Sequence, residues 1–183
     1  MRAHGRARAG FSVVEVTVMA TILVVGVLGM VGAVIAGVRL VAVNREMAVA
    51  HEAARAVIER MQDTPFASVY ATFNADPADD PGGAGTAPGP RFSVPGMTLQ
   101  ANDPDGFVGD IVFPDTAVGG VTALNESVVD ARWGMPRDLN GDGVITAGAL
   151  PGAYMILPVR VRLQWRGIGG NRSIELDHVF ISH

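Results

Sequence analysis

The chain has 183 residues, a net charge of −4 and 49% hydrophobic residues, whereas charged residues make up only 17%. This composition excludes a disordered chain and a polycationic tail. The sequence contains no cysteine, which excludes disulfide scaffolds, thiol catalysis and cysteine-ligated zinc. All 14 basic residues are arginine, so Schiff-base chemistry and a phosphate-loop lysine are excluded as well.

The hydrophobic residues concentrate near the N-terminus, in a run from Phe11 to Val38 in which Glu15 is the only charged residue. A bilayer core of about 30 Å needs roughly 20 apolar residues in a helix, so this run predicts a membrane-spanning segment. Residues 1–10 carry arginines and no acid, which favours an N-terminus on the cytoplasmic side. The rest of the chain is then expected outside the cytoplasm.

A cleaved secretory signal is the first alternative for this N-terminus. The apolar run is longer than the 7 to 15 residues typical of such signals, and no clear small-residue cleavage site follows it. A plain uncleaved anchor leaves Glu15 unexplained, because a carboxylate inside a membrane helix costs about 2.5 to 3.5 kcal/mol. Glu15 therefore indicates a function or a specific partner, unless it reaches the headgroups from the start of the helix.

The residues Gly10-Phe11-Ser12-Val13-Val14-Glu15 resemble the processing signal of type IV pilins and type II secretion pseudopilins. In that family a prepilin peptidase cuts after the glycine and methylates the new N-terminal residue, usually phenylalanine. The resemblance implies cleavage after Gly10, methylation of Phe11 and a role in assembly for Glu15. Its carboxylate would neutralise the charged N-terminus of a neighbouring subunit in apolar surroundings.

The resemblance covers about the first 50 residues and includes one departure. Many type IV pilins have a proline in the middle of the apolar helix, where this chain has glycines: Gly26, Gly29, Gly32 and Gly37. Each glycine destabilises a helix by about 1 kcal/mol relative to alanine. Alternatively, the small glycines allow close packing between helices. The choice between a pilus and a secretion pseudopilus therefore stays open.

Beyond the apolar run, residues 39–62 predict an amphipathic continuation of the same helix. Apolar residues follow alternating steps of three and four and form one stripe, which would pack on a domain or form a short coiled-coil seam. Pro65 is expected to end the helix, since proline disfavours helical geometry in the residue before it. The helix from Phe11 to Gln62 would then be about 78 Å long.

Residues 63–183 predict a β-rich head outside the cytoplasm. Within it, residues 74–90 are rich in Asp, Pro, Gly and Ala and are expected to form a flexible surface loop. Alternating apolar and polar residues predict five strands: Arg91–Gln100, Phe107–Phe113, Val121–Trp133, Tyr154–Arg166 and Ser173–Ile181. The expected fold is α+β, with a long N-terminal helix packed on a C-terminal antiparallel sheet.

The last two segments predict a hairpin with one apolar face. A loop from Gly167 to Gly170 would place Arg162 opposite Glu175 and Arg160 opposite Asp177. The apolar face should contain Val159, Val161, Leu163, Trp165, Ile174, Leu176, His178 and Phe180. We interpret His178 as a core residue rather than a catalytic base or metal ligand.

The segment 138–146 matches the first part of an EF-hand or dockerin calcium loop. Glycine at the sixth position allows the sharp turn, and the expected ligands are Asp138, Asn140, Asp142, the Val144 carbonyl and Thr146. The cofactor predicted from this motif is calcium.

One ligand of that calcium loop is missing, because the twelfth position is Ala149 rather than a bidentate acid. Another segment, such as the Asp103 or Asp130 region, or water would have to replace it. The alternative is an Asx-rich turn that binds no metal.

Neither an enzyme nor a nucleic-acid-binding protein is expected. No serine has a nucleophile-elbow context, and no closely spaced histidine pair suits zinc. From Met61 onward the chain has seven arginines and fourteen acids, the opposite of a phosphate-binding surface.

Two hypotheses follow. The first is a structural subunit, a minor pilin or pseudopilin, of a type IV pilus or type II secretion filament. It would be a single-pass protein of the bacterial inner membrane and later part of a periplasmic or cell-surface filament, and its partners would be the prepilin peptidase and other subunits. The second is an unprocessed, membrane-anchored module outside the cytoplasm that binds calcium or another ligand.

Overall fold

A computed structural model describes residues 10, 12–118, 121–150 and 152–182 of the chain. Most of the predicted leader and Phe11 therefore lie outside the described residues. Internal contacts divide the chain into two units, residues 1–44 and residues 45–183, which are described separately below.

The first element is helix α1, which runs without a break from Val13 to Gln62. Ser12 caps its start, because the Ser12 Oγ accepts the N–H of Val14 at 3.3 Å. At its end the N–H of Asp63 still donates to the Glu59 carbonyl at 3.0 Å, but Pro65 has no N–H to continue the series. The predicted continuous helix and its end at Gln62 are confirmed.

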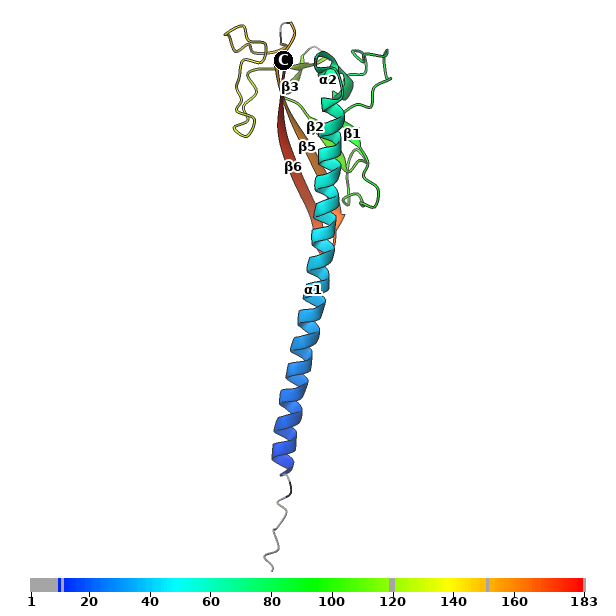
Figure 1. Ribbon diagram of the computed structural model, residues 1–183, viewed down its shortest axis with the longest axis vertical. Coiled ribbons are helices and arrows are strands. Elements are labelled where there is room, and N and C mark those ends of the chain that lie inside the picture. Colours follow the sequence, from blue (N-terminus) through cyan, green and yellow to red (C-terminus); the bar gives the residue numbers. More distant parts are fainter. Residues whose placement is uncertain (1–9, 11, 119–120, 151, 183) are drawn as a thin grey trace, which may run out of the picture. The chain divides into compact units, whose positions relative to one another are not determined.

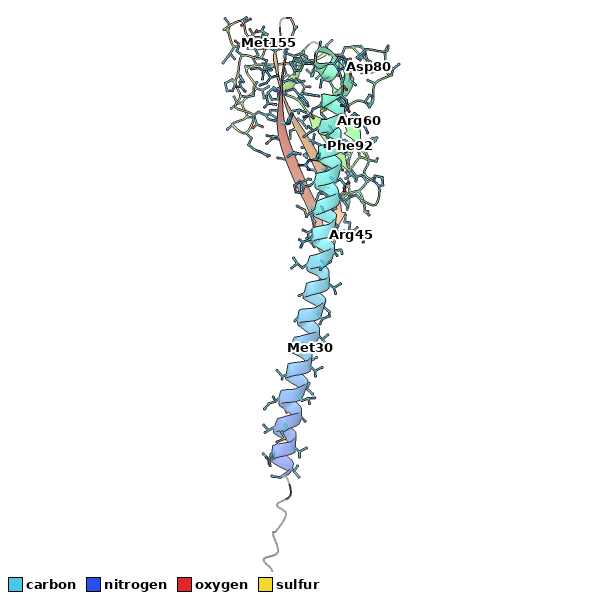
Figure 2. The ribbon with its side chains drawn as sticks, in the orientation of Figure 1. Met30, Arg45, Arg60, Asp80, Phe92 and Met155 are labelled. Atoms are coloured by element: carbon cyan, nitrogen blue, oxygen red, sulfur yellow. The ribbon has the colours of Figure 1, made fainter. Side chains whose placement is uncertain are left out.

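In the first unit, α1 is apolar on all sides. An 18-residue window has a mean hydropathy of 2.6, and none of it is buried. Figure 2 shows side chains of this stretch, Met30 among them, projecting outward from the helix. This part of α1 is long and apolar enough to cross a membrane.

The second unit contains a four-stranded antiparallel sheet with the order β1-β2-β5-β6 (Figure 1). Its strands are Arg91–Phe92, Gly109–Val112, Ile156–Gly167 and Gly170–Ile181. A short helix α2, Phe66–Phe73, follows α1, and a separate two-stranded sheet joins β3, Asp115–Val118, to β4, Val121–Leu124. The predicted α+β fold, with a long helix and a C-terminal antiparallel sheet, is confirmed.

The hairpin β5–β6 has the predicted register. Arg160 lies opposite Asp177, and Arg162 lies opposite Glu175. The connection is tighter than predicted, since Gly167 already pairs with Gly170 and only two residues remain in the turn. Positive φ angles of 92° at Gly169 and 135° at Gly170 make this short turn possible.

The main core lies between α1 and the predicted apolar face of the hairpin. Ala50 and Ala54 are completely buried, and their small side chains let the helix approach the sheet closely. Val161 and Trp165 on β5 are equally inaccessible to solvent. His178 lies at the edge of this face and is half-buried rather than part of the core, and burial lowers its pKa.

Glu46 lies near the point where α1 enters the second unit. Its side chain connects the helix to the β5–β6 turn. Its carboxylate accepts the indole N–H of Trp165 at 3.4 Å and the N–H of Ile168 at 3.2 Å. The Arg172 Nε lies 3.8 Å from the same carboxylate. A Cβ on Gly167 would crowd the Glu46 carboxylate, so a larger residue there would require the Glu46 side chain to shift.

The other face of the sheet is covered by residues 125–155. Leu139 and Trp133 form a second hydrophobic cluster that packs on Ile156 of β5. Arg160 lies 4.5 Å from the centre of the Trp133 ring and donates to Asp130 at 2.8 Å. That hydrogen bond is the main reason for the lowered pKa of Asp130. The head therefore has three layers: α1, the sheet and this segment.

Two predicted strands are wrong in their extent. The strand expected from Val121 to Trp133 ends at Leu124, because the Asn125 side chain accepts the N–H of Ser127 at 2.9 Å and turns the chain. The strand expected from Arg91 to Gln100 ends at Phe92, before a turn closed by a hydrogen bond from the Met97 N–H to the Val94 carbonyl at 3.2 Å.

Two elements were not predicted, helix α2 and strand β3. Residues 74–90 form no helix or strand, and local hydrogen bonds define their turns. One of these joins the Asn74 side-chain amide to Asp79 at 2.8 Å.

Candidate functional site

The N-terminal motif lies at the start of α1. Gly10 is exposed, and a Cβ added to it would meet no atom within 4 Å. The fold of the described chain thus has no local need for a glycine at this position. Phe11, the predicted methylation site, lies outside the described residues.

Glu15 occupies the first turn of α1, where a negative charge is favourable for the helix. Its side chain is exposed, and in the part of the chain that the structure describes no hydrogen bond or ion pair engages it. The chain therefore presents a carboxylate on an otherwise apolar helix surface, available to a partner outside the chain.

The predicted calcium loop brings three of its expected ligands into one turn. Asp138 accepts the N–H of Gly141 at 2.7 Å and that of Gly143 at 2.8 Å, one on each carboxylate oxygen. Asp142 accepts the Asn140 side-chain amide at 3.1 Å. These hydrogen bonds hold Asp138, Asn140 and Asp142 in one compact turn.

Hydrogen bonds also stabilise the ionised form of Asp138 in this loop. The N–H of Gly143 contributes most to lowering the pKa of Asp138 below its usual range, and the N–H of Gly141 adds to the effect. Asp138 is therefore ionised at neutral pH. Each carboxylate oxygen has two lone pairs, so an oxygen that accepts one N–H can still coordinate a hard cation.

Glu126, from a preceding segment, contacts this loop, and the sequence did not reveal that contact. It is completely buried, and one of its oxygens accepts the N–H of Leu139 at 2.7 Å. Its other oxygen accepts the N–H of Thr146 at 2.8 Å. The carboxylate therefore joins the two ends of the loop.

The two segments expected to supply the missing acid have other partners. Asp130 accepts hydrogen bonds from Arg160 on β5. Asp103 accepts the N–H groups of Asp105 and Gly106, both at 3.2 Å, in its own turn. Among the described residues, no group of three or more His, Asp or Glu side chains is arranged to hold a metal ion. A cation in the loop would depend on the Asn140 amide oxygen, backbone carbonyls and water.

No protein-family model matches this chain, and neither a curated protein nor a solved structure is significantly similar to it.

Proposed function

We propose that this protein is a structural subunit, a minor pilin or pseudopilin, of a type IV pilus or type II secretion filament. The observation that carries the proposal is the combination of the motif from Gly10 to Glu15 with one uninterrupted helix from Val13 to Gln62. In this proposal a prepilin peptidase removes residues 1–10 and methylates Phe11. The peptidase, rather than the fold, is then the reason for glycine at position 10, which agrees with the open space around it.

In this proposal the apolar part of α1 lies first in the membrane and then in the filament. In the inner membrane it spans the bilayer once, with the head outside the cytoplasm. In the filament the same surface packs against the helices of other subunits. Because both environments are apolar, transfer between them requires little change in solvation, and a specific electrostatic contact can decide the position of the incoming subunit.

Glu15 provides that contact in the proposed mechanism. After cleavage the amino group of Phe11 carries a positive charge, and a charge in apolar surroundings is costly unless it is paired. The Glu15 carboxylate of the preceding subunit lies in a similar apolar helix surface and carries the opposite charge. Pairing offsets the free-energy cost of placing the amino group and the carboxylate in apolar surroundings. It therefore favours the correct axial position of the new subunit.

Replacing Glu15 by alanine is expected to leave membrane insertion intact, because loss of a charge makes insertion easier. Incorporation into filaments should fall strongly, because the N-terminal amine of the neighbour then stays unpaired. Comparison of this protein in membrane and sheared-filament fractions by immunoblot measures both effects. Asp63→Ala, which removes an exposed acid just after α1, is the matched control and should assemble normally. Normal assembly of the Glu15 variant would rule out neutralisation by this residue.

We further propose that the loop 138–146 binds calcium. The specific observation behind this is that Asp138, Asn140 and Asp142 share one turn whose ends are joined by buried Glu126. The residues present suit a weak site, with an affinity of about 10⁻⁴ to 10⁻³ M as in extracellular modules. Should residues 1–10 prove to be retained, an anchored calcium-binding module is the second candidate function.

Calcium at about 1 mM is expected to stabilise residues 45–183, which form one compact unit, by about 0.4 to 1.4 kcal/mol relative to chelator. Thermal unfolding followed by circular dichroism measures the corresponding rise in Tm, and magnesium should produce much less. Asp142→Ala should remove the calcium response. Asp103→Ala alters a similar turn that lacks the motif and should retain it. An equal response in the Asp142 variant and the parent would identify the loop as a turn without metal.

A further inference from the structure

The β5–β6 turn lies at the end of the second unit where α1 enters it. Arg45 is the first residue of this unit and Glu46 is the second. The Glu46 carboxylate accepts the N–H of Ile168, which lies in the turn, at 3.2 Å. Figure 2 labels Arg45 on α1 beside the end of the hairpin. The turn and the first residues of the unit therefore lie at the same end of the unit.

The segment that contains Leu99 lies at this end as well. The N–H of Arg166 donates to the Thr98 carbonyl at 2.8 Å, and the Gln100 side-chain amide donates to the Arg172 carbonyl at 3.1 Å. These two hydrogen bonds attach the segment to both strands of the hairpin beside the turn. Four exposed residues consequently share one end of the unit, and we call them the turn surface: Arg45, Leu99, Arg166 and Ile168.

The turn surface combines positive charge with exposed apolar side chains. Among the described residues, no ion pair or side-chain hydrogen bond engages Arg45 or Arg166. Ile168 is 44% exposed and Leu99 is 39% exposed. Two arginines without acidic partners beside two exposed aliphatic side chains suit a partner that is both anionic and partly apolar.

The acids of this region are engaged by the chain itself. The Glu46 carboxylate lies 3.8 Å from the Arg172 Nε and accepts the N–H of Ile168. Asp103 accepts two backbone N–H groups of its own turn, and Asp105 lies 3.4 Å from the Arg91 Nε. Residues 45–183 as a whole contain ten arginines and seventeen acids, so the positive turn surface is an exception within an acidic unit.

Few residues connect this surface to the apolar run of α1. Residues 39–44 separate Val38, the last residue of that run, from Arg45. In a helix the distance from Val38 to Arg45 is about 10 Å, and even a fully extended chain would span only about 25 Å. The polar layer on each side of a bilayer core is about 5 to 8 Å thick. If the apolar run crosses a bilayer, the turn surface is therefore held close to the headgroups.

We propose that the turn surface binds anionic phospholipid headgroups of the membrane that α1 spans. The inference rests on the membrane-spanning helix of the proposed function. Guanidinium groups bind phosphate oxygens through paired N–H donors, while the aliphatic stems of arginines lie along apolar surface. Ile168 and Leu99 would enter the interfacial layer beside them, as the apolar residues of membrane-surface elements do. The contact would hold this end of the head at the membrane until the subunit enters a filament.

Spin labelling tests the proposal in the full-length protein, which contains no cysteine of its own. A nitroxide is attached at Asn171→Cys, an exposed position opposite Arg166 that leaves the turn surface intact. The protein is reconstituted in vesicles of phosphatidylcholine alone or of equal parts of phosphatidylcholine and phosphatidylglycerol. EPR power saturation then measures collisions of the label with O₂, which concentrates in the bilayer, and with a neutral nickel chelate, which stays in water.

We expect phosphatidylglycerol to increase the O₂ collisions of this label and to decrease its nickel collisions. Sodium chloride at 1 M should remove the change, because the Debye length then falls to about 3 Å. A label at Ala78→Cys, in the exposed segment 74–90, should stay accessible to the nickel chelate in both kinds of vesicle.

Charge reversal identifies the residues responsible. Arg166→Glu should remove most of the change that phosphatidylglycerol causes. Arg137→Glu is the matched control, because it reverses the charge of another exposed arginine without an ion pair among the described residues, and it should retain the change. Ile168→Ser should reduce the O₂ collisions without reversing any charge.

Three results would overturn the inference. The first is equal accessibility of the Asn171→Cys label in the two kinds of vesicle, and the second is an equal effect of Arg166→Glu and Arg137→Glu. The third is a label that becomes protected only when other filament subunits are added, which would assign the turn surface to a protein partner.

Alkaline carbonate extraction of the same vesicles separates these results from failure of the proposed function. Protein that stays in the bilayer while the label shows no response to phosphatidylglycerol contradicts only the lipid contact. Protein that is released by carbonate contradicts the membrane-spanning helix, and the lipid contact with it.

Discussion

Replacing Trp165 by alanine is expected to lower the stability of residues 45–183 by about 3 to 5 kcal/mol. The ring is 1% exposed and lies in the core between α1 and the hairpin, so truncation leaves a cavity that the neighbouring strands cannot fill. The change also removes the indole N–H that donates to Glu46 and leaves part of that carboxylate without its partner. Urea unfolding followed by circular dichroism measures the loss.

The matched control for this prediction is Arg166→Ala, the next residue of β5, whose side chain is exposed. A change within about 0.5 kcal/mol is expected there, as for surface positions in general. Trp165→Phe should lose less than Trp165→Ala, because it restores most of the buried volume without the N–H. Equal stability of the alanine variant and the parent would contradict the described core.

Replacing Gly10 by valine is expected to block removal of residues 1–10 completely. In the family that the motif resembles, the peptidase needs a very small residue before the cut, and a branched side chain obstructs it. The variant should accumulate in the membrane at its full length, which mass spectrometry or gel mobility distinguishes from the processed protein. Loss of processing also leaves Phe11 without a free amino group, so filaments should not contain this variant.

Gly26→Val is the control for this second prediction. A Cβ at Gly26 meets no atom within 4 Å, as at Gly10, but the residue lies inside α1 and away from the expected cut. It should be processed normally. A Gly10→Val protein of processed length would contradict the assignment of Gly10 as the last leader residue.

The parts of the fold with strong periodicity were predictable from the sequence. The helix was foreseen to Gln62 because its apolar residues repeat every three to four positions and Pro65 follows. The register of β5 with β6 was foreseen because two alternating segments flank a glycine-containing turn. In both cases a local pattern and the tertiary contacts favour the same structure.

The segment between these elements was predicted poorly, because its structure depends on contacts between distant residues. Residues 121–133 alternate in polarity like a strand, yet Asn125 turns the chain after Leu124. The role of Glu126 had no local signal, because its partners are backbone N–H groups of Leu139 and Thr146. The partner of Asp130, one of the suggested replacement acids, had no local signal either, since this side chain is held by Arg160 on β5.

The intact mass of the protein extracted from bacterial membranes tests the central proposal most directly. We expect a chain that begins at Phe11, lacks residues 1–10 and carries one added methyl group, and fragmentation should place that methyl group on the N-terminal amine. A chain that retains residues 1–10 and has no added methyl group would contradict the filament-subunit proposal.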